Sequence, residues 1–342
     1  MAYTTINKST DYFNTKLWAG NGSSQALTGV GHQTDMAWIK SRTDTRKHNL
    51  YDVVRGVQKR IVPNDTPAED TVPGVTAFGT DGFTVGSETD TNGGSRNFVG
   101  WSWKANGAGS ANTDGSINST VSVNTTAGFS IVKWTGNGGT ASVGHGLGVK
   151  PNIIIKKNLG AATNWIFSTT IIDGSNDFFY LNSTNAKGDS GETAPTTSLI
   201  NLYANSENNG NGNGMIAYCF VEKAGYSKFG TYVGNGSNDN GTIVYTGFKP
   251  AFVLVKRYNN TEQWQMTDAA RDEAVTPNFA RLNPDTTSAE SANTTWARID
   301  KFSNGFRLGG NDTVSNGSGD SYIYMAFGQS LVGSNNVPCT AR

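Results

Sequence analysis

A five-residue phrase occurs three times in this chain: an aromatic residue, one spacer residue and then Gly-Asn-Gly. The copies begin at Trp18, Trp134 and Tyr232, so they stand 116 and 98 residues apart. A period near 100 residues is the length of a whole seven- or eight-strand β-sandwich, whereas solenoid and propeller repeats have periods of roughly 20–50 residues. A six-bladed propeller remains the alternative, but it requires a half-repeat at about 50 residues that the sequence does not display. The repeat therefore predicts one domain design used three times.

A short apolar segment ending in lysine follows each copy of the phrase. The lysines lie 20, 21 and 22 residues beyond the first glycine, at Lys40, Lys157 and Lys256. Eight residues further on come His48, Trp165 and Trp264. These nearly constant distances predict corresponding core strands, and we interpret the lysines as solvated strand ends.

Copies one and three share an acid and an arginine at the same spacing. The pairs are Asp52/Arg55 and Asp268/Arg271, and copy two has Thr169 in place of the acid. We interpret them as a repeated ion pair or turn brace. The alternative is a glycosidase acid, which needs a second carboxyl group within about 5–10 Å.

Each copy closes with an apolar, aromatic segment. These segments are 98–103, 215–220 and 322–327, and a Gly/Asn turn precedes each at 92–94, 211–214 and 316–319. Runs of 4–8 residues rich in Val, Ile, Phe, Tyr and Trp between turn clusters are typical of β-sandwiches and barrels. We predict an all-β chain of three tandem antiparallel β-sandwich domains, jelly-roll or lectin-like, that arose by internal triplication.

Small-residue stretches suggest the domain boundaries. Residues 105–111 and 224–227 have this composition. We predict β-sandwich repeats at 1–108, 109–225 and 226–332, followed by a C-terminal tail at 333–342.

Composition excludes several classes of protein. Charged residues make up 16% of the chain and the formal net charge is zero, so a nucleic-acid partner, which requires a basic field, is not expected. The N-terminus has no signal-peptide pattern, and no apolar run approaches the roughly 18 residues of a membrane span. We expect synthesis in the cytoplasm without secretion or membrane insertion.

The sequence offers few residues for catalysis or metal binding. The three histidines, His32, His48 and His145, do not coincide in the alignment of the copies. Nucleophile-elbow, zinc-protease, P-loop and Cys–His motifs are absent. We expect no enzyme activity, no cofactor and no metal site, with a calcium site in the loop from Asn311 to Asp320 as the open alternative.

The repeated phrase itself supplies candidate glycan contacts. Apolar sugar faces stack on exposed aromatic rings, and sugar hydroxyls pair with amides. The candidate residues are Trp18, Asn21, Trp134, Asn137, Tyr232 and Asn235. The competing interpretation is that the rings fill the core and that Gly-Asn-Gly forms a type I′ hairpin turn.

The chain resembles repetitive proteins carried by marine tailed bacteriophages. The segments that carry the resemblance are 12–22, 29–40, 144–148, 225–230 and 245–250. Thr34, where the other copies have Pro151 and Pro250, departs from the family pattern. The resemblance implies a virion component, such as part of a tail fibre or tailspike that attaches the particle to its host.

The resemblance also suggests partners. We expect other virion proteins, copies of the same chain with a homotrimer favoured, and a host surface glycan, because three-fold symmetry strengthens weak receptor contacts through multivalency. A capsid decoration or tail adaptor protein without receptor role is the first alternative, and a glycan-binding or glycan-depolymerising module is the second. A receptor site is sought where the copies differ, at 41–75, 158–200 and 257–298.

Overall fold

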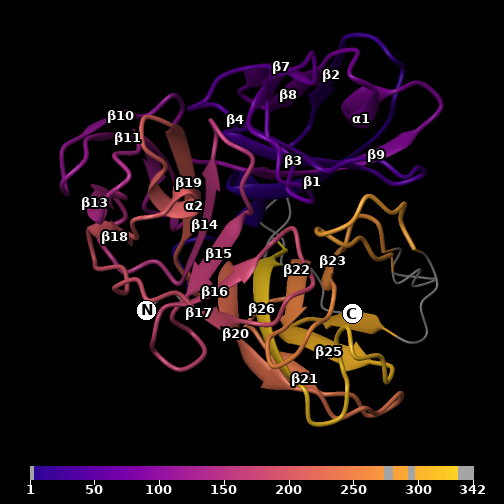
Figure 1. The fold of residues 1–342 in the computed structure, drawn as a ribbon. Coiled ribbons are helices and arrows are strands. Elements are labelled where there is room, and N and C mark those ends of the chain that lie inside the picture. The colour runs from indigo at the N-terminus through magenta and orange to yellow at the C-terminus, as the bar shows by residue number, and fades with distance from the viewer. Residues whose placement is uncertain (1–3, 273–279, 292–296, 330–342) are drawn as a thin grey trace.

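The computed structural model describes residues 4–272, 280–291 and 297–329. The fold is all-β, with several antiparallel sheets and three short helical segments: η1 (Ser9–Asp11), α1 (Thr89–Asn92) and α2 (Ser206–Asn209). The predicted tail at 333–342 lies outside the described residues. In Figure 1 the chain forms three neighbouring lobes, which we call region 1 (β1–β9), region 2 (β10–β19) and region 3 (β20–β26).

Each region contains one large sheet, and the strand order at its centre recurs. Region 1 has β1-β9-β3-β4, region 2 has β12-β19-β14-β15, and region 3 has β20-β26-β22-β23. The strands pair antiparallel in all three. Their bounds are β1 Phe13–Ala19, β9 Asn97–Trp103, β3 Met36–Ser41, β4 Asn49–Asp52, β12 Phe129–Thr135, β19 Gly214–Phe220, β14 Ile153–Asn158, β15 Ile166–Thr169, β20 Ser227–Val233, β26 Ser321–Gly328, β22 Pro250–Arg257 and β23 Trp264–Asp268.

The sheet of region 2 is longer than the other two. It has eight strands, because β10 (Ser110–Asn112) and β11 (Ser119–Asn124) extend one edge, and β16 (Asp177–Tyr180) and β17 (Gly188–Asp189) extend the other. In region 1 the corresponding place beside β4 is taken by a single bridge between Leu50 and Ile61. Strands β16 and β17 therefore fall in 158–200, one of the segments where the copies differ in sequence, whereas β10 and β11 lie outside these segments.

A smaller sheet lies against each large one. Their strand orders are β2-β8-β7, β13-β18 and β21-β25-β24, and a separate ribbon pairs β5 with β6. The bounds are β2 Gln25–Thr28, β5 Lys59–Arg60, β6 Asp70–Thr71, β7 Val75–Gly79, β8 Gly82–Val85, β13 Ala141–Gly144, β18 Leu199–Leu202, β21 Ile243–Tyr245, β24 Arg298–Phe302 and β25 Gly305–Gly309. Three separate apolar clusters fill the spaces within the regions.

A fourth and larger apolar cluster is shared by all three regions. The closing strands β9, β19 and β26 supply its centre, because successive side chains on a strand point to opposite faces. Tyr218 and Phe220 of β19, for example, face the shared cluster, whereas Ala217 and Cys219 face the interior of region 2. Since both faces of these strands are buried, their sequences are continuously apolar.

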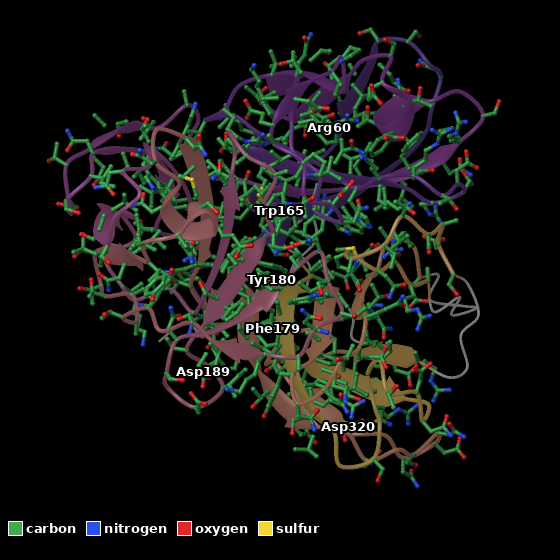
Figure 2. The ribbon with its side chains drawn as sticks, viewed as in Figure 1. Arg60, Trp165, Phe179, Tyr180, Asp189 and Asp320 are labelled. Atoms are coloured by element: carbon green, nitrogen blue, oxygen red, sulfur yellow. The ribbon has the colours of Figure 1, made fainter. Side chains whose placement is uncertain are left out.

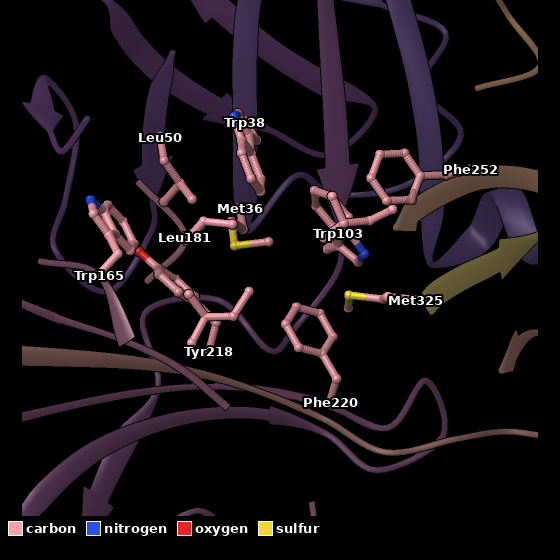
Figure 3. A pocket seen from close by; sticks show the side chains of 12 residues that line it. Met36, Trp38, Leu50, Trp103, Trp165, Leu181, Tyr218, Phe220, Phe252 and Met325 are labelled. Atoms are coloured by element: carbon pink, nitrogen blue, oxygen red, sulfur yellow. The ribbon is translucent and has the colours of Figure 1, made fainter. Parts of the chain in front are cut away.

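Three aromatic rings from corresponding positions meet in the shared cluster. The ring centroids of Trp103 and Phe220 are 6.4 Å apart, those of Phe220 and Phe327 are 6.0 Å apart, and those of Trp103 and Phe327 are 5.7 Å apart. All three contacts are edge-to-face, the arrangement that the ring quadrupoles favour. Beside this triad is an apolar cavity of about 20 Å³ lined from all three regions (Figure 3).

Backbone hydrogen bonds between the regions repeat in a cyclic order. Three residues at corresponding positions each donate an N–H to a carbonyl of another region. The bonds are Glu69 to Leu159 at 2.9 Å, Lys187 to Tyr258 at 3.1 Å and Glu290 to Arg42 at 2.8 Å. Regions 1 and 2, regions 2 and 3, and regions 3 and 1 are therefore joined in the same way.

The aromatic position eight residues after each lysine forms a second cyclic set. Trp165 Nε1 donates to Val62 O at 2.8 Å, and Trp264 Nε1 donates to Tyr180 O at 3.1 Å. His48 takes the third place, because its Nδ1 accepts from Trp38 Nε1 and its Nε2 donates to Asn283 O at 3.1 Å. Figure 2 shows Trp165 and Tyr180 between the lobes.

The repeated acid–arginine pairs are buried structural contacts. Arg271 Nε lies 2.5 Å from Asp268 Oδ2, and Arg55 bonds Asp52 in the same way; all four side chains are inaccessible. The carboxylates also accept from another region: Trp101 Nε1 donates to Asp268 at 2.9 Å and Tyr218 OH donates to Asp52 at 2.6 Å. At the third place Thr169 and Met325 provide no such pair.

The prediction that the repeated lysines are solvated is wrong. Lys40, Lys157 and Lys256 are buried, and burial lowers the pKa of each to about 8. Their ammonium groups donate to backbone carbonyls, including Thr66 O at 2.7 Å from Lys157 and Thr184 O at 2.8 Å from Lys256, both in another region. The sequence could not reveal these acceptors, because they come from distant segments.

Removal of Asp268 tests the buried pair. We expect Asp268→Ala to lower the free energy of unfolding by about 3–5 kcal/mol, because Arg271 stays buried without this carboxylate. Asp11→Ala, which breaks an exposed pair with Lys8, should cost no more than about 1 kcal/mol. Urea denaturation of both variants measures the difference, and equal costs would contradict the structural role.

The buried histidines predict a dependence of stability on pH. Burial lowers the pKa of His48 well below 6.5 and that of His32 to about 4. Below pH 6.5 the unfolded chain binds protons that the folded rings do not, so stability falls as the pH drops, by about 1.4 kcal/mol per pH unit for each ring. Asp285, whose pKa burial raises to about 6, acts in the opposite direction.

The contribution of one histidine is isolated with His48→Gln. Between pH 6 and pH 5 the unfolding free energy of this variant should fall by about 1.4 kcal/mol less than that of the parent protein. Urea titrations at half-unit pH steps give both slopes. Identical slopes would show that His48 is not neutral in the folded protein.

Candidate functional site

The Gly-Asn-Gly phrase connects a large sheet to a small one in each region. It follows β1, β12 and β20 and precedes β2, β13 and β21, which belong to other sheets. The prediction of a type I′ hairpin turn is therefore wrong. That turn needs positive φ at two central residues. Among the described non-glycine residues only Gln58 and Ser95 have positive φ, so the asparagine of the phrase does not have the conformation that this turn requires.

The two glycines of the phrase are required for different reasons. A Cβ on the first glycine would lie 2.3 Å from Gly93 O at Gly20, 2.3 Å from Gly210 O at Gly136 and 2.4 Å from Gly317 O at Gly234. The last glycine has a left-handed backbone, with φ of 71° at Gly22, 74° at Gly138 and 65° at Gly236. Close backbone approach and one left-handed residue thus fix the phrase.

The asparagine of the phrase pairs with a buried asparagine. Asn92 Nδ2 donates to Asn21 Oδ1 at 3.0 Å, and two further pairs follow the same pattern: Asn209 to Asn137 at 2.6 Å and Asn316 to Asn235 at 3.3 Å. The sequence alignment placed the copy-two turn at 211–214, and the structure corrects it to Asn209-Gly210. Asn92 and Asn209 are the last residues of α1 and α2, and Asn316 directly follows a turn at 313–315. The sequence places Asn92 and Asn316 in turns but does not reveal their partners, which lie more than seventy residues away in the chain.

The aromatic residues of the phrase lie inside the regions. Trp18 is 7% exposed, Trp134 is 3% exposed and Tyr232 is 8% exposed. Trp18 stacks on Phe98 at 5.5 Å, and Tyr232 stacks on Tyr322 at 4.9 Å. Their contacts favour the core-filling interpretation, and a glycan contact at these residues stays a prediction.

A different candidate site lies in region 2, where the chain departs from the repeat. It is a cavity of about 110 Å³, which we call the region 2 cavity. The residues that line it are Ile166, Phe178, Tyr180, Ser190, Glu192, Tyr203, Asn205, Glu207 and Asn208.

Strand alternation builds the aromatic side of the region 2 cavity. On β16, Phe179 points into the shared core and its ring lies 5.7 Å from that of Trp264. Phe178 and Tyr180 point to the opposite face, where their rings meet edge-to-face at 5.3 Å. Tyr203, which is 47% exposed, adds a third ring.

Two carboxylates on the other side of the cavity have different environments. Glu192 is neutralised by Lys156 Nζ at 2.8 Å, in a pair that is almost wholly inaccessible. Glu207 accepts from neutral donors, Asn164 Nδ2 at 2.8 Å and Tyr180 OH at 3.4 Å. Among the described residues Glu207 forms no ion pair, although the charge of Lys157 acts on it through space, and it has capacity to accept further hydrogen bonds.

Amides of α2 complete the wall. Asn205 caps the short helix, since its side chain accepts from Asn208 N at 2.8 Å. Asn208 is 7% exposed, and its Oδ1 has no hydrogen-bond partner among the described groups. Buried polar atoms are usually paired, so this oxygen has capacity to accept a hydrogen bond.

Ion pairs occupy the corresponding place in region 1. Arg60, at the position of Phe178, bonds Asp70 at 2.5 Å and lies 3.5 Å from Glu88 and 3.7 Å from Asp90 of the α1 segment. Asp90 corresponds to Glu207. The cavity is therefore a feature of region 2, produced by replacing an arginine with an aromatic ring.

The remaining predicted chemistry has structural partners. His32 contacts Thr10 O at 2.8 Å and Ser102 Oγ at 2.9 Å, and burial lowers the pKa of His145. In the loop proposed for calcium, Arg257 bonds Asp320. Within the described ranges there is no group of three or more His, Cys, Asp or Glu side chains suited to a metal ion. No helix among the described residues has the length and apolarity to cross a membrane.

Residues 8–330 match the model of a family described as a domain of unknown function, DUF7483. The chain folds as an all-β protein and belongs to the DUF7483 family. No curated protein and no solved structure matches the chain.

The buried asparagine gives a testable prediction for the phrase. Asn92 Nδ2 also donates to Ser23 O at 2.6 Å and Gly86 O at 3.0 Å, so Asn92→Ala should cost about 2–4 kcal/mol of unfolding free energy. The exposed Asn185→Ala should change it by less than about 0.5 kcal/mol. Thermal and urea unfolding measure both, and similar small losses would show that the asparagine pair is dispensable.

Proposed function

We propose that this chain is a structural component of a bacteriophage virion, part of a tail fibre or tailspike-type appendage for attachment to the host surface. The observation that carries the proposal is the cyclic set of contacts around the shared core. Buried side chains and backbone hydrogen bonds join the lobes into one body. Such a body suits an appendage that transmits force and exposes a binding surface to the host. The resemblance to repetitive phage proteins supports the same role.

The repeated strand order supports a triplication as the origin of the chain. We propose β-sandwich repeats at 1–108, 109–225 and 226–332, because the order β1-β9-β3-β4 has a counterpart in each. A jelly-roll or lectin-like arrangement belongs to the same proposal. The protein acts by adhesion and assembly without turnover.

The proposed partners are other virion proteins and copies of the same chain. A homotrimer would multiply weak receptor contacts. The chain also supplies three related lobes by itself, a geometry that suits a three-fold position in a particle. Neither nucleic acid nor membrane insertion forms part of the proposal.

A glycan-binding module is the second candidate, and the region 2 cavity favours it. Aromatic rings beside carboxylate and amide acceptors are groups that recognise sugars. This function and the structural one are compatible in a host-attachment protein. A capsid decoration or tail adaptor protein without receptor role remains the competing assignment.

The position of the chain in purified particles tests the proposal. We expect mass spectrometry to find it in virions, and cryo-electron microscopy to place it on the tail appendage with three chains at each attachment point. Density on the capsid or collar would favour the decoration or adaptor assignment. One isolated chain per attachment point would refute the trimer, and absence from washed particles would refute a virion role.

A further inference from the structure

We infer that the region 2 cavity binds one neutral saccharide residue. This inference deepens the proposed attachment role, because it assigns the class of receptor and the residues that contact it. The glycan contact is thereby assigned to the region 2 cavity and not to the aromatic residues of the repeated phrase, whose rings are buried.

The aromatic wall provides the apolar half of the site. Phe178 and Tyr180 meet edge-to-face, so the cavity offers a ring face and a ring edge at an angle. The C–H face of a pyranose can lie on such a surface, while Tyr203, which is 47% exposed, stands where the rest of a glycan chain would leave. Concave sites with apolar walls and a few fixed polar groups are the usual form of small-molecule sites.

The polar wall is rich in acceptors. Glu207 has capacity beyond its three neutral donor groups, and Asn208 Oδ1 is buried without a partner among the described groups. Sugar hydroxyls are donors, so they satisfy both groups at once. At about 110 Å³, the cavity has room for several water molecules, at roughly 10–15 Å³ for each, which such hydroxyls would displace.

Charge selects among saccharides. Lys156 neutralises Glu192 in a direct ion pair, whereas Glu207 accepts from neutral donors and interacts with the Lys157 cation only through space. An acidic sugar would bring a second negative charge close to Glu207, and such repulsion is costly away from bulk water. The site should therefore prefer neutral sugars to uronic or sialic acids.

Region 1 indicates how the site is closed. Its corresponding position carries Arg60, which reaches Glu88 and Asp90. Phe178→Arg should place a cation near Glu207 in the same way and fill the cavity without unfolding the protein. This substitution tests the site with a side chain that the chain already uses at that position.

The experiment is a titration of the full chain with glucose, N-acetylglucosamine, glucosamine and glucuronate, followed by saturation-transfer and chemical-shift NMR. We expect saturable binding of a neutral sugar with Kd on the order of 1 mM, and binding of glucuronate at least ten-fold weaker. Phe178→Arg and Tyr203→Ala should each weaken binding at least ten-fold. Tyr245→Ala, which alters a tyrosine of region 3 that is 69% exposed, should leave it unchanged.

Three results would overturn the inference. They are no saturable binding of either neutral sugar, binding by a folded Phe178→Arg variant equal to that of the parent, and binding of glucosamine alone, which would indicate a cation site. Circular dichroism and melting temperature establish that each variant is folded. Microscopy of particles tests the virion role independently of sugar binding. Absence of sugar binding would therefore refute this inference without deciding whether the chain belongs to the virion.

Discussion

The meeting of Trp103, Phe220 and Phe327 is the contact on which the rest of the structure depends. Each ring comes from a closing strand with both faces buried, so each large sheet needs a cover from outside its own region. Burial of apolar area stabilises by about 25 cal/mol per Å². The regions therefore form one body with a common core and are not independent domains joined by linkers.

Apolar contact alone does not orient the lobes, and the buried polar groups add that specificity. Asp268 accepts from both Arg271 and Trp101, so its position is set by two regions at once. Fully paired networks of this kind are favourable, whereas a missing partner is costly. Thr169 and Met325 occupy the corresponding positions between regions 2 and 3. Neither side chain is charged, so no buried charge needs a partner there.

The sequence was sufficient to predict the all-β class and the corresponding strands, because the distances from glycine to lysine to aromatic residue are nearly constant. It could not predict the shared core. Burial of the second face of β9 or β19 only makes the strand sequence more apolar, and this does not show which segment covers that face. Lys157 was misassigned because its acceptor Thr66 O belongs to another region. The region 2 cavity was not predicted, because it depends on contacts such as that between Tyr180 and Glu207, and only part of its lining falls in the divergent segment 158–200.

The cyclic contacts also have a consequence for the order of folding. Regions 1 and 2, and regions 2 and 3, are consecutive in the chain, but the joint between regions 3 and 1 has no short covalent connection. Its ion pair between Arg42 and Glu290 spans 248 positions, and loop-closure entropy and folding time both grow with such separation. We therefore expect this seam to be the last to close during folding, and the aromatic faces of the outer regions to be open to a neighbouring chain until it does.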